Sequence, residues 1–509
     1  MLDDSETRIE QILQLEVEQV QPPLPAAEPE IASSRRRVLE YWIIGIVLAG
    51  FALIAGVHIR TASIWYDEAV TLLITSGHAP LDWSYGMHQF EPTANLAKIL
   101  FQLYHYDVHP PLYFWTLALW RVLFGGSLEA ARAMSALFSL GTLVLLYRFA
   151  VVLGMRWAFV PAALYALSGT GLRYAYNARP YAMASFLIVL TLYLVRQHSN
   201  WSGVCAGACV SAHYFAALII GPLLAMECAR RWKANRRWSL IVASSFFVCS
   251  APLILLISRH IDARPLQYPG FAGLLGETAV LLLGSLSSVL PSTWFWPVWG
   301  LLIVMAGGVL AAGSIWALRR RVFDVPVAYG VFLGAFLVMA AVTNKSIAKM
   351  PSEYYLGIAA PLASLLVGFG LDAYVLASPA FGALLIAATV GATPITFDVN
   401  YREMVAKIRP QCDDCAIVVG MGYGPIPACI LYEARNMDMD IFLLTANDTV
   451  QSIRQRLGNR RTIFFVPTNE PGTAVIEREF VQAYVSSPRD RYFRLDGEKP
   501  NAQPEIGIR

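Results

Sequence analysis

The amino-acid sequence predicts a polytopic α-helical membrane protein with a small α/β domain at its C-terminal end. Of its 509 residues, 56% are apolar and only 15% are charged. The apolar residues gather in blocks of roughly 15 to 20, about the length that a helix needs to cross a bilayer, and they do not alternate as they would in a β-barrel. Because unsatisfied backbone groups are costly in hydrocarbon, each block is expected to be helical.

The distribution of arginine predicts how the chain is oriented in the inner (plasma) membrane. Arg35, Arg36 and Arg37 precede the first apolar block, and short cytoplasmic loops collect Lys and Arg, so the N-terminus is expected inside the cell. The later basic loops agree with about eleven spans and a C-terminal end outside the cytoplasm. The spans are expected near residues 41–59, 130–148, 157–172, 181–196, 201–212, 214–229, 238–258, 294–317, 325–343, 354–375 and 378–396. The two around His213 are short, which indicates a broken or re-entrant pair.

Three regions follow from this topology. Residues 1–37 are expected to be a disordered cytoplasmic tail, and residues 38–396 a transmembrane catalytic domain whose first external loop covers 60–127. Residues 397–509 are expected to be a soluble periplasmic α/β domain. Its strands are predicted at Cys415 to Gly420, Ile441 to Thr445 and Arg461 to Val466, and its helices at Thr449 to Leu457 and Thr473 to Tyr484. The net charge of +3 is too small to indicate a nucleic-acid partner.

The acidic pair Asp67 and Glu68 is the first candidate for chemistry. It follows the first span, in Trp65-Tyr66-Asp67-Glu68-Ala69, and is therefore expected on the non-cytoplasmic face. An acidic pair at a bilayer surface is poorly placed for packing but well placed to take a proton from an acceptor. Adjacent carboxylates attract hard cations, but two ligands are too few to infer a metal site, so no metal or other cofactor is predicted.

Several basic residues are expected on the external side, where the topology does not require them. Beside an acidic pair they suit a phosphate carried on a lipid, although long basic side chains also snorkel to headgroups routinely. The set consists of Arg173, Arg179, Arg259, Arg264, Lys345 and Lys349.

Polar residues also stand where external helices are expected to begin. In His109-Pro110-Pro111-Leu112-Tyr113 two prolines fix the direction of a helix that extends to Phe124 and is expected to lie at the membrane interface. His109 would project from its first turn and could donate to a phosphate oxygen, or could be an incidental polar neighbour of the prolines. Asn177-Ala178-Arg179-Pro180-Tyr181 repeats the design, and His213 lies at an external hinge. Three such helix ends on one face would make a site.

Taken in order, these motifs resemble a known family. The acidic pair, the His-Pro-Pro-Leu-Tyr helix, Leu128-Glu129-Ala130-Ala131-Arg132, the Ala-Arg-Pro-Tyr segment and the His-Tyr hinge are similar to those of the GT-C class of membrane glycosyltransferases. Within that class they resemble the bacterial protein O-mannosyltransferase and aminoarabinose (lipid A) transferase superfamily. The resemblance covers about residues 40–260 well and continues weakly through Tyr354-Tyr355-Leu356.

The resemblance implies that a sugar moves from a polyprenyl-phosphate donor to a lipid, glycan or protein acceptor at the periplasmic face. Asp67 matches the catalytic aspartate, and Glu68 would support or orient it. The positions implied for the donor phosphate are His109, Arg132, Arg179 and His213, and those implied for the substrate pocket are Trp65, Tyr66, Tyr113, Tyr181 and Tyr354. Family members often have an Arg-Tyr pair near a late span, but Glu353-Tyr354 stands here, so Lys345 or Lys349 would take over the phosphate contact.

The chemistry agrees with this resemblance. The donor already contains a phosphate leaving group, so the enzyme has to deprotonate an acceptor and stabilise the departing phosphate. A single base opposite the leaving group predicts inversion at the anomeric carbon. The alternatives are a polytopic lipid or glycan transporter or flippase, and a scaffold without catalysis. Transporters place ionisable groups near mid-membrane and often on repeated halves, whereas here the candidates cluster at one face.

Two motifs of the C-terminal domain are interpreted as structural features and not as cofactor or metal sites. Gly420-Met421-Gly422-Tyr423-Gly424 follows a strand but lacks the spacing of a dinucleotide loop, so it is interpreted as a turn. Cys412 and Cys415 could bind zinc or form a disulfide, and without a second pair an external disulfide is favoured.

Overall fold

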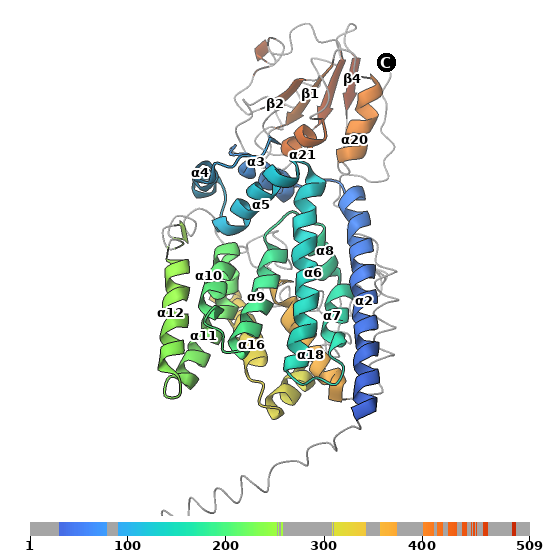
Figure 1. The fold of residues 1–509 in the computed structure, drawn as a ribbon. Coiled ribbons are helices and arrows are strands. Elements are labelled where there is room, and N and C mark those ends of the chain that lie inside the picture. The colour runs from blue at the N-terminus through green and yellow to red at the C-terminus, as the bar shows by residue number, and fades with distance from the viewer. Residues whose placement is uncertain are drawn as a thin grey trace, which may run out of the picture. The chain divides into compact units, whose positions relative to one another are not determined.

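The computed structural model describes residues 30–78, 90–251, 310–342, 357–373, 401–411, 415–420, 426–434 and 440–444, with short pieces between 253 and 308 and between 449 and 494. The chain divides into two compact units, Met1–Ile46 and Val47–Arg509. Figure 1 labels the helices and strands. The predictions for Lys345, Lys349, Tyr354, Cys412, the span 378–396 and the helix at Thr473 to Tyr484 lie outside the described residues.

Two helices in the described ranges are long and apolar enough to cross a bilayer, Arg37–Thr61 and Leu128–Val152. The first is most of α2 (Glu30–Thr61), whose apolar side chains are largely exposed, with Trp42 70% exposed and Leu53 71%. Exposed apolar side chains of this kind suit a lipid surface. The number of about eleven spans stays a prediction.

Three helices fill the expected external loop: α3 (Tyr66–Thr75), α4 (Leu96–Tyr106) and α5 (Pro111–Phe124). Only α5 was predicted, and it begins at the second proline, whose fixed backbone suits a first helical position. In α3 every residue from Glu68 to Thr75 is buried, and its polar residues Asp67, Thr71 and Thr75 recur four residues apart, a helical spacing that was not used to predict the helix.

The next helices agree with the sequence except at one break. α6 (Leu128–Val152) begins where the Ser127 hydroxyl accepts from the Ala130 N–H at 3.1 Å. The span predicted at 157–172 is two helices, α7 (Phe159–Leu167) and α8 (Gly169–Ala175), because Ser168 leaves the helical conformation and its hydroxyl caps the second helix at the Gly171 N–H. α9 (Tyr181–Arg196) has the predicted bounds.

The short helices predicted around His213 are present: α10 (Ser202–Ala212), η2 (Tyr214–Ala216) and α11 (Ala217–Arg231). α12 (Arg236–Ser250) packs closely against α10 through two glycines. A Cβ at Gly203 would lie 2.1 Å from the Val242 carbonyl oxygen, and one at Gly207 would lie 2.4 Å from the Cys249 Cβ. Further along the chain come α16 (Asp324–Val342), η4 (Gly357–Ala359) and α18 (Ala360–Ala373).

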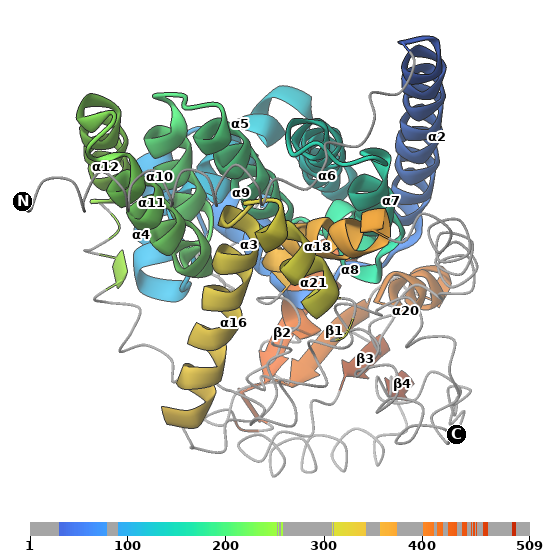
Figure 2. The ribbon, with the colours of Figure 1, turned by 90° about the horizontal axis from the view of Figure 1, so that it is seen from below.

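The C-terminal residues contain a parallel sheet with strand order β2-β1-β3-β4, which Figure 2 shows from below. The strands are β1 (Cys415–Gly420), β2 (Asp440–Leu444), β3 (Thr462–Val466) and β4 (Arg491–Arg494). The first three are at the predicted places to within one residue. β4 was not predicted, because this edge strand has arginine at both ends and no apolar run. The helices here are α20 (Tyr401–Ile408), η5 (Arg409–Gln411) and α21 (Ile426–Glu433).

Side chains of α20 and α21 bind the ends of helices from the N-terminal half of the chain. The Tyr432 hydroxyl accepts from the Leu128 N–H at 2.7 Å, at the start of α6. Arg402 donates to the Arg60 carbonyl at 2.6 Å and forms ion pairs with Glu129 and Glu433. Because a helix start has N–H groups without partners in the helix, Tyr432 completes the first turn of α6.

Candidate functional site

Glu68 is a fully buried carboxylate whose two oxygens are both bonded within the protein. Oε1 accepts from the Ala178 N–H at 2.9 Å, and Oε2 accepts from the Trp65 N–H at 3.4 Å. The Arg132 guanidinium donates to both oxygens, at 2.8 and 2.6 Å. The expectation that the acidic pair is poorly placed for packing is therefore wrong for Glu68, because the fold supplies a buried cation and two N–H donors for it.

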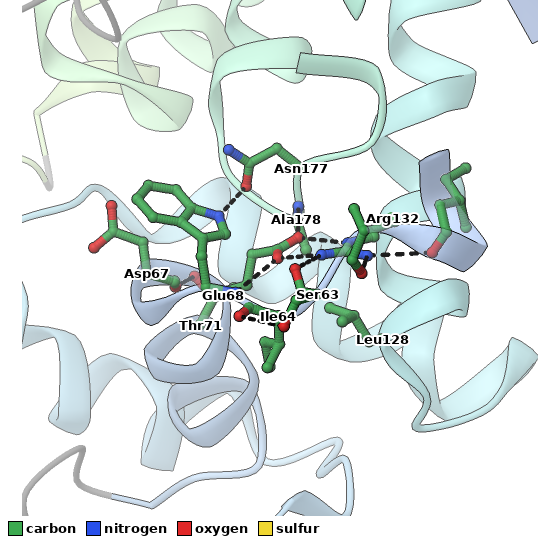
Figure 3. Close-up of polar contacts among 12 residues, drawn as sticks. Ser63, Ile64, Asp67, Glu68, Thr71, Leu128, Arg132, Asn177 and Ala178 are labelled. Carbon is green, nitrogen blue, oxygen red and sulfur yellow. Dashed lines mark hydrogen bonds and ion pairs between the residues drawn. The ribbon is translucent and has the colours of Figure 1, made fainter. Parts of the chain in front are cut away.

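Arg132 uses all five of its N–H groups inside the fold, and its side chain is 1% exposed. Besides the two bonds to Glu68, it donates to the carbonyl oxygens of Ile59, Ala62 and Ser63 at 3.2, 2.8 and 2.9 Å. It thus joins the end of α2, the start of α3 and the body of α6, as Figure 3 shows. No N–H of Arg132 remains for the donor phosphate that the resemblance assigns to it, so in this arrangement it supports the acidic pair.

Asp67 points away from Glu68 and Arg132 (Figure 3), and its side chain is 23% exposed. Its neighbour is Arg179, whose Nη2 lies 3.6 Å from Oδ2 of Asp67. The other end of the same guanidinium, Nη1, donates to the Thr71 hydroxyl at 2.9 Å and to the Asp67 carbonyl at 3.3 Å. The two acids of the pair thus have different environments, and Asp67 is the one with access to solvent.

His109 contacts the same Arg179 guanidinium. Nη2 of Arg179 is 3.1 Å from Nε2 and 3.5 Å from Nδ1 of His109, and Nδ1 is 2.5 Å from Oδ1 of Asp107. The same carboxylate oxygen accepts from the backbone N–H groups of Val108 and His109, at 2.6 and 3.1 Å. Asp107 was not singled out from the sequence, although an aspartate two residues before a helix-start histidine is a common pattern for a turn that bonds its own backbone.

His213 is buried beside His109, with ring centroids 6.3 Å apart, and beside Tyr181, at 5.5 Å. Burial, together with the nearby His109 and Arg179, lowers the pKa of His213 well below its ordinary value of 6.5. A neutral imidazole in this position avoids a further cation next to Arg179. The three helix ends that the sequence indicated, at His109, Arg179 and His213, therefore lie next to one another.

Arg121 fixes the other end of α3. Its Nη1 donates to the Leu72 carbonyl at 3.0 Å and to the hydroxyls of Thr75 and Ser76, and its Nη2 donates to the Phe90 and Gly126 carbonyls. Burial lowers the pKa of Arg121 to about 10, so the side chain remains a cation at neutral pH. Arg121 was not singled out from the sequence, where it falls only within the helix expected at the membrane interface. A buried arginine at the C-terminal end of α3 satisfies carbonyl groups that the helix leaves without partners.

The predicted pocket residues divide between the edge of the site and its interior. Trp65 donates from Nε1 to the Asn177 side-chain oxygen at 3.0 Å, and Trp65 and Tyr66 are both half-buried beside Asp67. Tyr113 and Tyr181 are buried, and Tyr181 stacks on Tyr174 with centroids 5.2 Å apart. Among the residues that the structure describes, no group of three or more His, Cys, Asp or Glu side chains could hold a metal ion.

Residues 108–255 match the model of the dolichyl-phosphate-mannose-protein mannosyltransferase family. The resemblance to membrane glycosyltransferases is confirmed. This segment contains His109, Arg132, Arg179 and His213. No curated protein matches the sequence at a significant level.

Two solved structures of ArnT from Cupriavidus metallidurans are similar to this chain at low identity. The apo structure is 15% identical, with 78% of this chain and 75% of that chain covered and a TM-score of 0.45. The structure bound to undecaprenyl phosphate is 14% identical, with 77% and 75% covered and a TM-score of 0.43.

Proposed function

We propose that the protein is an inverting glycosyltransferase that moves a sugar from a polyprenyl-phosphate donor to an acceptor at the periplasmic face of the inner membrane. The observation that carries this proposal is the difference between the environments of Asp67 and Glu68. Glu68 has its oxygens bonded within the fold, while Asp67 is partly exposed and lies 3.6 Å from a buried guanidinium. A partly exposed carboxylate can accept a proton, and a cation beside it can stabilise a departing phosphate.

In the proposed reaction Asp67 takes the proton from an acceptor hydroxyl or amine as that atom attacks the anomeric carbon. The bond from the anomeric carbon to the phosphate oxygen breaks, and the departing phosphate keeps the electron pair. Among the described residues, Arg179 supplies the positive charge beside Asp67, because its Nη2 lies 3.6 Å from Oδ2 of Asp67. With Asp67 as the partly exposed carboxylate of the described site, direct displacement and inversion are expected, since a double displacement needs a carboxylate nucleophile as well.

The other phosphate-side residues have indirect roles in this proposal. Nη2 of Arg179 lies 3.1 Å from Nε2 and 3.5 Å from Nδ1 of His109, so His109 acts on the phosphate through its contact with Arg179. Buried His213 packs behind His109. Lys345 and Lys349 remain candidates for a further phosphate contact. The family model that matches residues 108–255 is named for a mannose carried on a polyprenyl phosphate, which supports a donor of this class.

Replacement of Asp67 tests the proposal. Asp67→Asn keeps the size of the side chain and removes the base, so sugar transfer should fall by about 10²- to 10⁴-fold. Glu129→Gln is the matched control, because Glu129 is a half-exposed carboxylate in the first turn of α6 and lies outside the site. The readout is mass spectrometry of envelope glycolipids and glycoproteins from cells with each variant, followed by NMR of the product's anomeric configuration.

The outcomes separate the proposal from its alternatives. A sugar that disappears with Asp67→Asn and persists with Glu129→Gln supports transfer, and its carrier identifies the acceptor. Turnover that survives Asp67→Asn removes Asp67 as the base, and a product that retains the donor's anomeric configuration removes inversion. A transporter or flippase would leave the covalent structure of the glycans unchanged and alter only the side of the membrane on which they are found.

A further inference from the structure

We infer that Asn177 is a substrate-binding residue: its side-chain nitrogen, Nδ2, donates a hydrogen bond to an oxygen of the polyprenyl-phosphate sugar. The nature of this substrate rests on the proposed function, whereas the N–H2 group itself is a feature of the structure. Asn177 is 2% exposed, and among the residues that the structure describes its Nδ2 has no hydrogen-bond partner. A buried N–H group without a partner is costly, and in native proteins such groups usually bind water or a ligand.

The orientation of the Asn177 amide follows from its contact with Trp65. The indole Nε1–H can only donate, and it lies 3.0 Å from the side-chain oxygen of Asn177, so the oxygen has to face the indole. An exchange of the amide oxygen and nitrogen would place two N–H groups against each other. The nitrogen therefore points elsewhere, and Figure 3 shows it turned away from Arg132, to the side on which Asp67 lies.

The backbone that carries the Asn177 side chain is also held in place. Its carbonyl oxygen accepts from the Arg179 N–H at 2.8 Å, and the next N–H along the chain, that of Ala178, is bonded to Glu68 at 2.9 Å. Glu68 is in turn bonded to Arg132. The amide nitrogen is therefore presented in a fixed direction before any substrate binds, and a binding group that is ordered in advance loses less entropy when the substrate arrives.

The neighbours of Asn177 place this N–H2 group beside the proposed chemistry. Its partner Trp65 is half-buried and stands two residues before Asp67, the partly exposed carboxylate. Two residues after Asn177 comes Arg179, whose Nη2 lies 3.6 Å from Oδ2 of Asp67. A sugar attacked beside Asp67, with its phosphate leaving beside Arg179, brings hydroxyl and phosphate oxygens into this region. Either kind of oxygen can accept the hydrogen bond that Asn177 offers, and a few placed polar groups of this kind orient a bound substrate.

Two substitutions separate substrate binding from a purely structural role, in which Asn177 does no more than bond Trp65. Asn177→Leu removes that bond and the N–H2 group at nearly constant size, whereas Trp65→Phe removes the bond and leaves the amide. If only the bond matters, Asn177→Leu should have no further effect in a protein that already carries Trp65→Phe. The inference requires that its effect persist in that background. Gln102→Leu is the matched control, because Gln102 is a buried amide that bonds the Gly77 carbonyl, at the other end of α3 from Asp67.

The experiment measures two quantities for the full-length protein: the rate of sugar transfer in membranes and, in detergent, the affinity for a sugar-free polyprenyl phosphate by calorimetry. Asn177→Leu should lower the transfer rate by about tenfold or more, both alone and in the Trp65→Phe background. A matching fall in the affinity for the sugar-free probe assigns the contact to a phosphate oxygen, and an unchanged affinity assigns it to a sugar oxygen. Gln102→Leu should change neither quantity.

Asn177→Asp decides the question if Asn177→Leu does not fold or if Trp65→Phe alone abolishes transfer. It keeps an oxygen for the indole N–H and puts a second oxygen in place of the N–H2 group, so transfer should still fall, and wild-type transfer in this variant overturns the inference.

The remaining outcomes separate this inference from the proposed function. Unchanged transfer and probe affinity in Asn177→Leu, or a loss that disappears in the Trp65→Phe background, overturns the inference. If Asp67→Asn abolishes transfer while Asn177→Leu changes nothing, the proposed function stands and the inference fails. If the wild type transfers no sugar, the proposed function fails and the probe affinity alone decides: a weaker affinity in Asn177→Leu supports the contact, and an equal or absent affinity overturns it.

Discussion

The Arg132 guanidinium donates to both carboxylate oxygens of Glu68, at 2.8 and 2.6 Å, and thereby connects the first turn of α3 to α6. Neither side chain has appreciable exposure to solvent, at 1% for Arg132 and 0% for Glu68. A buried ion pair of this kind is strongly coupled to folding, because removal of one partner leaves the other charge without compensation. Within the acidic motif, Glu68 therefore has a structural role through its pair with Arg132, and Asp67 does not take part in that pair.

Glu68→Gln should destabilise the protein by about 3–5 kcal/mol, because it leaves the buried Arg132 cation without its anion. The measurement is the midpoint of thermal unfolding of the purified protein in detergent. Glu129→Gln, a half-exposed carboxylate on the same helix as Arg132, should change the midpoint little. The double variant Glu68→Gln with Arg132→Met should recover part of the loss, and a Glu68→Gln protein as stable as the wild type would contradict the role assigned to the pair.

The neutral state of His213 should make stability depend on pH. Its pKa in the folded protein lies well below 6.5, so below pH 6.5 the unfolded chain takes up a proton that the folded protein refuses. The stabilisation is present above pH 6.5 and is lost as the pH falls toward the folded pKa, by up to about 1.4 kcal/mol per pH unit. His213→Asn should flatten this acid limb in a series of unfolding midpoints from neutral to acid pH.

Exposed His105 provides the control for this pH effect. His105→Gln removes an exposed histidine and leaves the buried His213 ring in place, so the acid limb should remain. An equal flattening in both variants would mean that the acid sensitivity does not come from the buried ring.

Tyr432→Phe should loosen the start of α6. The substitution removes the hydroxyl that accepts from the Leu128 N–H at 2.7 Å and leaves the ring, including its edge contact with Phe90, in place. A lost hydrogen bond of this kind costs about 1 kcal/mol. Hydrogen exchange at residues 127–132 should become faster, and the control Tyr104→Phe, on the exposed side of α4, should leave it unchanged. Exchange that is identical in the two variants would show that Tyr432 does not hold this turn.

The contacts of Tyr432 and Arg402 also affect how acceptor choice should be tested. A role of the C-terminal domain in the choice of acceptor could be examined by deletion of the residues after Phe397. Such a deletion would remove the partners of the Leu128 N–H and the Arg60 carbonyl together. Substitutions on the sheet, away from α20 and α21, are therefore the better probes of acceptor choice.

The sequence predicted those parts of the fold that have a clear apolar pattern or a strong stop signal. The bounds of α9, the broken pair around His213 and the first three strands agree with the structure. α3 was not predicted, although Asp67, Thr71 and Thr75 recur four residues apart, because residues 60–127 were assigned to an external loop. The break at Ser168 was missed as well, because an apolar run gives no indication of a hydroxyl cap within it.

The sequence predicted which residues form the candidate site better than it predicted the contacts between them. His109, Arg179 and His213 were expected to converge with the acidic pair, and they lie together. Which side chain bonds which depends on rotamers and on helix positions that the sequence does not contain. Arg132 illustrates this, because nothing in its motif distinguishes a phosphate ligand from the partner of Glu68. Asp107 could have been found from its spacing to His109, and Arg121 could not.

The short connection between α8 and α9 contacts the acidic motif through three successive residues. Asn177 holds Trp65, the Ala178 N–H holds Glu68, and Arg179 meets Asp67, so three successive residues touch the same acidic motif. Loops between helices ordinarily accept insertions and deletions, and homologous proteins vary most in them. Here the insertion or deletion of a single residue would disrupt all three contacts together. During evolution this turn should therefore keep its length even where the sequences of the neighbouring helices change.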